Sequence, residues 1–185
     1  MTHEILFAGF GGQGVLSMGM TLAYAGMLEG KEVSWMPSYG PEMRGGTANC
    51  IVIISDHPIS SPIVTTFDAV IALNQPSVDK FEKSVKGNGI LMYDESNVIV
   101  PPTRTDLTII PVPIEHEAVK LSNARVKNMI MLGAFLSVCQ VVSVSSVVKA
   151  LEKVLPERYH HLLAINKQAL ERGEQLVIEA ATPLV

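Results

Sequence analysis

The feature that most constrains the fold is a glycine-rich segment, Gly9 to Gly14, whose glycines have the spacing GxGxxG. It follows a short apolar run, Glu4 to Ala8, that predicts a buried strand. It precedes a long apolar segment, Gly14 to Leu28, that predicts a helix lying between two packing partners. Glycines in this context allow a tight turn and let an anion approach the amides that open the helix. The segment therefore predicts either an anion or nucleotide-type ligand site, or close packing of strand on helix alone.

Strand and helix patterns alternate along the rest of the chain. Further strands are predicted at Glu32–Met36, Thr47–Ser55, Phe67–Leu73, Gly89–Tyr93 and Leu107–Ile110. Helices are predicted at Ser77–Lys86, Ile114–Leu121, Lys127–Val141, Val144–Val154 behind a Ser143 cap, and Glu157–Arg172, with Gly173 as its stop. This order predicts an α/β, three-layer domain with a mostly parallel sheet covered on both faces and a helical C-terminal part. Residues 1–185 are expected to form a single domain.

An ordinary nicotinamide-binding domain needs an acidic residue at the end of its second strand, about 20 residues after the glycines. The chain has Ser34 to Ser38 at this place. The nearest carboxylates, Glu32 and Glu42, are predicted inside the strand and beyond the following turn. Their positions argue against a stand-alone nicotinamide dehydrogenase.

A second candidate loop, Ser38 to Gly46, follows the second predicted strand, where α/β sheets commonly bind ligands. Ser38 and Tyr39 offer hydroxyl groups, and Arg44 offers a guanidinium that can bind phosphate or carboxylate. Glycines in this segment allow close backbone contact. The pattern favours a binding role over a surface turn with a solvated arginine.

Composition indicates a subunit of a larger assembly. Only 17% of the residues are charged and 48% are hydrophobic, which predicts apolar surface that other chains cover. We assign this surface to the first helix and to the uncharged stretch Asn128–Val148, and we expect the isolated chain to form homo-oligomers. The same stretch contains Gln140 and several serines, so it predicts two buried helices rather than a membrane span.

Charge and targeting patterns exclude several classes of partner. The formal net charge of −4 gives no reason to expect a nucleic-acid footprint. The start of the sequence lacks the basic segment of an export signal, so a cytoplasmic location is expected. The five histidines show no metal spacing, and Cys50 and Cys139 lie in apolar segments that predict core thiols. We therefore predict neither a metal site nor a catalytic residue on this chain.

Four segments together resemble the γ subunit of 2-oxoacid:ferredoxin oxidoreductases. They are Gly9–Gly14, Ser38–Gly46, the strand containing Asp68, and Asn128–Gly133, and the second is the most specific. The resemblance covers nearly the whole chain and implies a Rossmann-like domain that helps to enclose coenzyme A. It implies a reaction in which a 2-oxoacid, coenzyme A and oxidised ferredoxin give acyl-CoA, carbon dioxide and reduced ferredoxin, with 2-oxoglutarate favoured over pyruvate or branched-chain oxoacids.

The resemblance also implies a division of labour between chains. Thiamine diphosphate, magnesium and iron–sulfur clusters are expected on the α, β and, where present, ferredoxin-like δ subunits, with ferredoxin as the acceptor. This chain has neither a Gly-Asp-Gly motif followed by Asn nor a cysteine-rich segment, so it is not expected to be active alone. The alternative is a non-catalytic Rossmann-like ligand-binding or assembly module.

The residues expected to hold an anionic group of coenzyme A come from both glycine loops. They are Gly9, Gly11, Gly12, Gln13, Gly14, Ser38, Tyr39, Arg44, Gly45 and Gly46. Which of the two loops contacts the ligand stays open at this point. Asn128 is a candidate helix cap, with a ligand role secondary.

Overall fold

The computed structural model describes residues 1–38 and 47–181. The strands in these ranges are β1 (Thr2–Phe10), β2 (Glu32–Ser38), β3 (Thr47–Ser55), β4 (Phe67–Ala72), β5 (Val85–Asp94) and β6 (Thr108–Val112). The α-helices are α1 (Val15–Leu28), α2 (Gln75–Phe81), α3 (Ile114–Lys120), α4 (Lys127–Val138), α5 (Val144–Val154) and α6 (Leu163–Ala181). Short 3₁₀ helices cover Glu82–Ser84, Ala124–Val126 and Glu157–Leu162.

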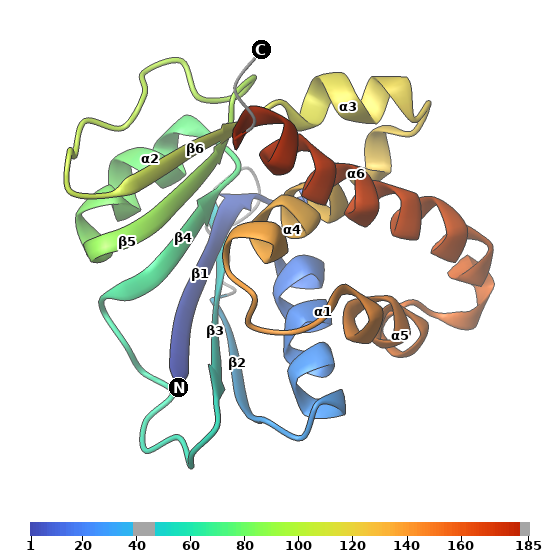
Figure 1. Cartoon of the computed structure of the whole chain (residues 1–185), viewed down its shortest axis with the longest axis horizontal. Helices are drawn as coiled ribbons and strands as arrows, with labels where there is room; N and C mark the ends of the chain where they lie inside the picture. The colour runs from blue at the N-terminus through green and yellow to red at the C-terminus, as the bar shows by residue number, and fades with distance from the viewer. Residues whose placement is uncertain (39–46, 182–185) are drawn as a thin grey trace.

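The strands form one sheet in the order β2-β3-β1-β4-β5-β6 (Figure 1). Neighbours from β1 to β6 are parallel, whereas β3 is antiparallel to both β1 and β2. The mostly parallel sheet predicted from the sequence is confirmed. One strand departs from the parallel arrangement. After β1 and α1 the chain forms β2 two places away from β1, and β3, which lies between them, is antiparallel to both.

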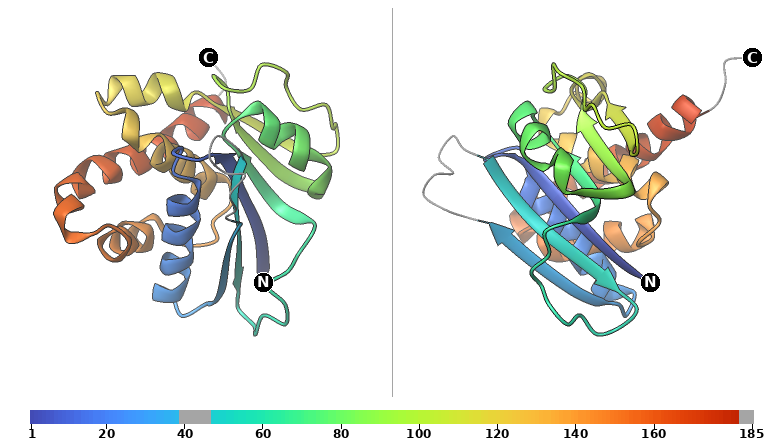
Figure 2. Two further views of the ribbon diagram at one scale, coloured as in Figure 1. Left: turned by 180° about the vertical axis from the view of Figure 1, so that it is seen from behind. Right: turned by 90° about the vertical axis from the view of Figure 1, so that its left-hand side faces the viewer.

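The sheet is covered unequally on its two faces. Helices α1, α3, α4, α5 and α6 lie on one face, and α2 lies on the other (Figures 1 and 2). Adjacent residues of β1 serve different cores, because side chains alternate across a strand. Phe7 meets Phe135 of α4 edge-to-face, with ring centroids 6.2 Å apart, whereas Leu6 packs with Val70 and Leu91 on the α2 side. The three predicted layers are present, and of the α-helices described only α2 forms the layer on the second face.

Helix α1 packs between the sheet and α5, as its nearly continuous apolar sequence predicts. Helix α1 also buries a polar side chain, because Thr21 is buried and its Oγ1 donates to the backbone oxygen of Ser17 at 2.8 Å. Tyr24, Met27 and Leu28 are exposed. The C-terminal end of α1 therefore presents apolar side chains at the surface.

Helix α6 crosses α4 at two glycines. A Cβ on Gly133 would overlap the backbone oxygen of Leu170, and a Cβ on Gly173 would overlap that of Ile130. Gly173 therefore does not end a helix, as its sequence context suggested, because α6 continues to Ala181. The reason is that glycine allows the two backbones to touch, and this packing outweighs its unfavourable helix propensity of about 1 kcal/mol.

The uncharged stretch forms two separate helices, as predicted. Helix α4 ends at Val138, and the side chain of Ser143 caps α5 by accepting from the backbone nitrogen of Ser146 at 3.2 Å. None of the helices described is both long and apolar enough to cross a membrane. Residues Asn128–Leu136 are buried within the chain itself, so our assignment of this part to a subunit interface was wrong.

Candidate functional site

The glycine loop opens α1 with free backbone donors. Gly12 and Gly14 have φ angles of +93° and +78°, a region that favours glycine. Gly14 is the N-cap of α1 and makes no side-chain cap hydrogen bond. Because the first amides of a helix lack partners within the helix, this end carries partial positive charge. Gly11 and Gly12 are exposed, so an anionic group can reach the loop.

The side chain of Gln13 fixes the shape of this loop. Its Oε1 accepts from the backbone nitrogen of Phe10 at 2.6 Å and from Nδ2 of Asn74 at 3.2 Å. Its Nε2 donates to the backbone oxygen of Leu73 at 3.0 Å. Gln13 therefore joins the β1–α1 loop to the β4–α2 loop, and the geometry supports a positioning role for its amide group.

These two loops lie at the point where the chain departs to opposite faces of the sheet. After β1 the chain enters α1 on one face, and after the adjacent strand β4 it enters α2 on the other (Figure 2). Such a switch point leaves a crevice outside the carboxyl ends of the strands, where open α/β sheets bind ligands. Asn74 lies there, buried, and its Oδ1 caps α2 by accepting from the backbone nitrogen of Ser77 at 2.9 Å.

Close packing explains two of the predicted glycines. A Cβ on Gly9 would lie 2.8 Å from Oε1 of Gln13 and 2.8 Å from Cγ2 of Val15. A Cβ on Gly14 would lie 2.5 Å from Nδ2 of Asn128. The close packing suggested by the GxGxxG pattern is therefore present, and Gly11 and Gly12, which lie between these glycines, are exposed.

Asn128 supports the loop from α4. Its Nδ2 lies 3.4 Å from the backbone oxygen of Gly14, its Oδ1 accepts from the backbone nitrogen of Met129 at 3.0 Å, and only 9% of it is exposed. We predicted Asn128 as the cap of this helix, but the N-cap of α4 is Val126, two residues earlier. The sequence pattern that pointed to Asn128 is a polar residue at the start of an otherwise apolar helix.

A polar cluster that sequence reasoning missed lies at the ends of β5 and β6. Asp94 is buried and accepts from Nδ2 of Asn97 at 2.5 Å and from the backbone nitrogen of Ser96 at 3.1 Å. Burial raises the pKa of Asp94 above its ordinary value, although these hydrogen bonds oppose the shift. Glu115 binds Nζ of Lys127 at 2.6 Å beside it. The sequence pattern that could have found this cluster is an acidic residue, Asp94, at the end of a buried strand.

The second predicted loop is described only at its boundary. Ser38 ends β2, is exposed, and pairs with Asn49, which in turn pairs with Ala8 of β1. Ser38 therefore lies at the same edge of the sheet as the glycine loop. Tyr39, Arg44, Gly45 and Gly46 lie outside the described residues. Of the two nearest carboxylates, Glu32 begins β2 at the opposite edge, and Glu42 also lies outside the described residues.

Both cysteine thiols are at least partly buried in the fold. Cys50 is fully buried, which raises its pKa to about 12, and its Sγ donates to the backbone oxygen of Val15 at 3.6 Å. Cys139 follows α4 rather than lying inside it and is half-buried, with its Sγ 3.8 Å from Nδ1 of His3. Burial also raises the pKa of Cys139. Within residues 1–38 and 47–181, no group of three His, Cys, Asp or Glu residues could hold a metal ion.

The sheet, its switch point and the glycine loop at the start of α1 define a Rossmann-like α/β domain. The model of the pyruvate ferredoxin/flavodoxin oxidoreductase family matches residues 4–176, and the chain belongs to this family.

Two curated relatives show how the chain corresponds to family members. It is 37% identical over 174 residues to the 2-oxoglutarate synthase subunit KorC of Methanocaldococcus jannaschii, covering 90% of this chain and 92% of that protein. It is 46% identical over 134 residues to the ketoisovalerate oxidoreductase subunit VorA of Methanothermobacter thermautotrophicus. That match covers 72% of this chain but spans only 28% of the length of VorA.

Solved structures agree with this assignment. A keto/oxoacid ferredoxin oxidoreductase γ subunit from Geobacter sulfurreducens has a TM-score of 0.81 and 32% identity, covering 97% of this chain and 98% of that one. A 2-oxoglutarate:ferredoxin oxidoreductase from Magnetococcus marinus, with 2-oxoglutarate, coenzyme A and succinyl-CoA bound, has a TM-score of 0.87 and 26% identity. It covers 99% of this chain and 32% of that one. The γ-subunit resemblance stated from the sequence is confirmed.

Proposed function

We propose that this chain is the γ subunit of a multi-subunit enzyme that oxidatively decarboxylates a 2-oxoacid to acyl-CoA and carbon dioxide and reduces ferredoxin. The observation that carries the proposal is the match along nearly the full length of both chains to the KorC subunit, together with the equally complete match to a solved γ subunit. The correspondence to separate subunits in these relatives supports placing the remaining parts of the enzyme on other chains.

The role proposed for this chain is to hold an anionic group of coenzyme A. The uncapped start of α1 and the exposed Gly11 and Gly12 can accept a phosphate, and Gln13 keeps the loop in shape. Arg44 and Tyr39 are proposed to add charge and a hydroxyl group from the second loop. The related enzyme from Magnetococcus marinus, which was solved with coenzyme A bound, supports this choice of ligand.

The redox and carbanion chemistry is proposed to lie on partner chains. Thiamine diphosphate with magnesium would supply the reactive carbanion, and iron–sulfur clusters would carry electrons to ferredoxin. The two cysteines of the chain do not fit an iron–sulfur cluster, because Cys50 is buried in β3 and Cys139 follows α4. The proposed partners are the α and β subunits and a ferredoxin-like δ subunit, in the cytoplasm.

We propose 2-oxoglutarate as the oxoacid, because the match to the 2-oxoglutarate synthase subunit extends over nearly all of both chains. A branched-chain oxoacid is the second candidate, since identity to the ketoisovalerate subunit is higher over a shorter region. The test is to purify the complex with its native partners and to measure CoA-dependent dye reduction with 2-oxoglutarate, 2-oxoisovalerate and pyruvate. Faster turnover with 2-oxoisovalerate would select the second candidate, and no turnover with any oxoacid would favour the assembly-module alternative.

A further inference from the structure

A pocket of about 410 Å³ lies at the end of α1 opposite the glycine loop. Its walls come from the connection between α4 and α5, the C-terminal end of α1, and α6. Since α1 has 14 residues, the pocket lies about 20 Å from the candidate coenzyme A site. It is therefore separate from that site and has a volume in the range of ligand pockets.

The charged groups around the pocket leave an excess of negative charge. Glu29 accepts from the backbone nitrogen of Ser143 at 2.7 Å. Partial burial opposes ionisation of Glu29, but hydrogen bonds from Ser143 and Ser146 lower its pKa below the ordinary value. Lys31 is already bound to Asp56, with 2.9 Å between Nζ and Oδ1. The side chain of Glu174 has no hydrogen bond or ion pair within the part of the chain that the structure describes.

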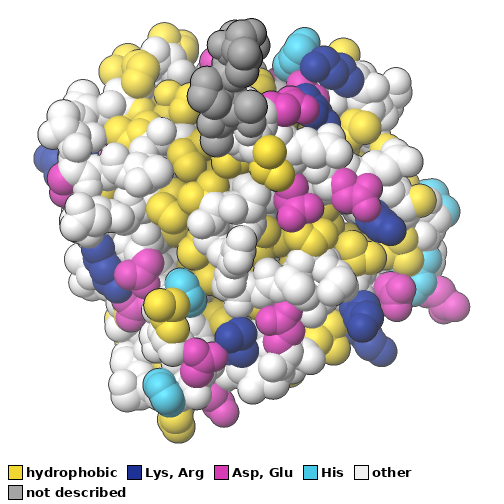
Figure 3. All heavy atoms as spheres, in the orientation of Figure 1, with side chains coloured by type: hydrophobic (Ala, Val, Ile, Leu, Met, Phe, Trp, Pro, Cys, Tyr) yellow, Lys and Arg dark blue, Asp and Glu magenta, His cyan; other side chains and the backbone are white. Residues whose placement is uncertain are grey.

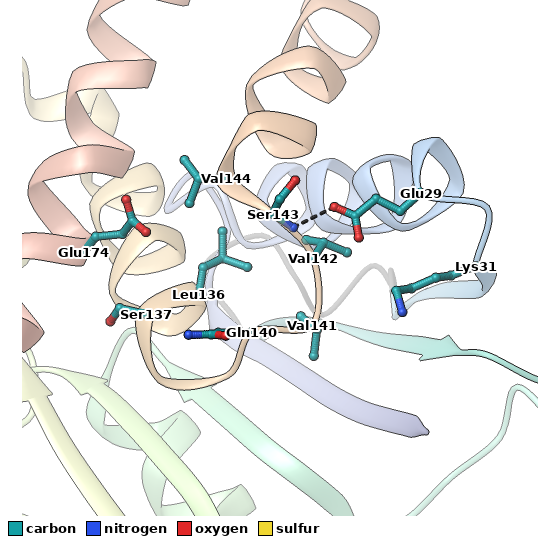
Figure 4. A pocket seen from close by; sticks show the side chains of 10 residues that line it. All are labelled: Glu29, Lys31, Leu136, Ser137, Gln140, Val141, Val142, Ser143, Val144 and Glu174. Carbon is teal, nitrogen blue, oxygen red and sulfur yellow. Dashed lines mark hydrogen bonds between the residues drawn. The ribbon is translucent and has the colours of Figure 1, made fainter.

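The two carboxylates face each other across apolar side chains. Figure 4 shows Glu174 extending into the pocket from α6 and Glu29 extending from the opposite side. Leu136, Val142 and Val144 lie between them. An occupant that matches these walls needs an apolar stem and a positively charged end. Lysine and arginine side chains have this combination, because their methylene groups pack on apolar surface while the head group remains solvated or paired.

We propose that this pocket receives a lysine or arginine side chain of a partner subunit, with its stem over Leu136, Val142 and Val144 and its charge between Glu29 and Glu174. The pocket is larger than one such side chain, so neighbouring residues of the partner segment enter its mouth as well. The existence of the partner rests on the proposed function. The choice of a basic side chain rests on the charge and apolar surface of the pocket.

The first test measures assembly of the complete complex. Glu174→Gln removes the unpaired carboxylate, and Glu171→Gln is the matched control: it removes the same charge one turn earlier, where Glu171 is 48% exposed and paired with Lys167. We expect Glu174→Gln to weaken binding of this chain to its partners at least about tenfold and to reduce the salt dependence of binding. Glu171→Gln should change binding less than twofold. Equal effects of the two variants would overturn the proposal.

The second test uses the isolated chain and so does not depend on the enzymatic assignment. Methyl NMR signals of Leu136, Val142 and Val144 are followed during titration with n-butylammonium and, separately, with n-butanol. We expect the cation to bind more tightly than the alcohol to the wild-type chain, with the difference lost in Glu174→Gln. Equal binding of both probes would overturn recognition of charge. Selective cation binding with unchanged assembly of the Glu174→Gln complex would overturn the partner side chain in favour of a free organic cation.

Discussion

Gln13 lies at the carboxyl edge of the sheet and donates from Nε2 to the backbone oxygen of Leu73 at 3.0 Å. This hydrogen bond joins the loop that opens α1 to the loop that opens α2. The two loops lie on adjacent strands whose following helices cover opposite faces, so Gln13 connects both layers of the fold at the place where a ligand is expected.

Replacing Gln13 should loosen the glycine loop. In Gln13→Ala all three side-chain hydrogen bonds are lost, and we expect the free energy of unfolding to fall by about 1–3 kcal/mol. Coenzyme A affinity of the assembled enzyme, measured by isothermal titration, should fall about tenfold. Gln13→Glu is the informative companion, because it retains the acceptor for Phe10 but adds negative charge beside the proposed anion. Wild-type affinity in both variants would contradict this role.

Arg44→Ala tests the second loop in the same titration. If the guanidinium binds an anionic group of coenzyme A, its removal should weaken binding by about tenfold or more, since hydrogen bonds to charged groups contribute about 1.5–3 kcal/mol. Arg158→Ala, in the 3₁₀ helix between α5 and α6, removes an equal charge and serves as the control. Unchanged affinity in Arg44→Ala would exclude Arg44 from the site.

The α4–α6 crossing should not accept side chains. We expect Gly173→Ala and Gly133→Ala each to destabilise the chain by about 2–4 kcal/mol in urea unfolding, because a Cβ at either position overlaps the backbone of the other helix. Gly87→Ala is the control, because a Cβ on Gly87 would lie no closer than 3.7 Å to another atom, Oδ2 of Asp106. We expect this variant to lower the free energy of unfolding by less than about 1 kcal/mol. A neutral effect of Gly173→Ala would show that the helices can separate without loss.

Acid should destabilise the chain through Glu117. The side chain of Glu117 is 3% exposed and accepts from Nε of Arg172 at 2.6 Å, which lowers its pKa to about 2 despite burial, with Lys120 helping. Because this pKa is lower in the folded chain than in the unfolded chain, the contribution of Glu117 is complete above about pH 4.5. It is lost as the pH falls toward 2.

The measurement is the urea midpoint between pH 2.5 and 6 for the wild-type chain and Glu117→Gln. We expect the variant to be less stable at pH 6 by about 2–3 kcal/mol and to show a shallower decline in acid. Parallel curves for the two proteins would exclude Glu117 as a source of the pH dependence.

The exposed end of α1 should promote self-association of the isolated chain. Met27 and Leu28 are 61% and 50% exposed, and Figure 3 shows further hydrophobic side chains gathered over the middle of one face. Sedimentation velocity should detect oligomers at high concentration, and Met27→Glu with Leu28→Glu should shift the chain toward monomer. Ile63→Glu, at an exposed position between β3 and β4, is the control. A monomeric wild-type chain would contradict the expectation.

Much of the fold could be predicted because its signals are local. The strand Thr47–Ser55 and the helix Val144–Val154 have the predicted boundaries, since alternation of apolar residues and a serine cap are read within a few residues. The antiparallel pairing of β3 could not be predicted, because it depends on long-range contacts with β1. Gly173 was misassigned because a glycine that ends a helix and one that allows a close crossing give the same local pattern. Arg172 was predicted as the end of a helix, and its ion pair with Glu117, 55 residues away, has no local signal.

The candidate site was predicted in location but only partly in its contacts. The GxGxxG pattern identified the loop, and Ser38 lies at the predicted edge of the sheet. The partners of the loop are distant in sequence: Asn74 is 61 residues from Gln13, and Asn128 is 114 residues from Gly14. Neither Asn74 nor Asn128 belongs to a sequence motif from which its partner could be predicted. Such contacts follow from the topology of the folded chain.

The contact between Phe7 and Phe135 has a consequence for synthesis of the chain. The strand at the centre of the sheet is made first, yet its larger core is completed only when α4 and then α6, with Leu170, have been added. Until then helix α1 alone covers the apolar side of β1 that carries Phe7. A ribosome that stalls before Leu170 would therefore release an aggregation-prone fragment, and chaperones that bind nascent chains should contact this protein for most of its translation.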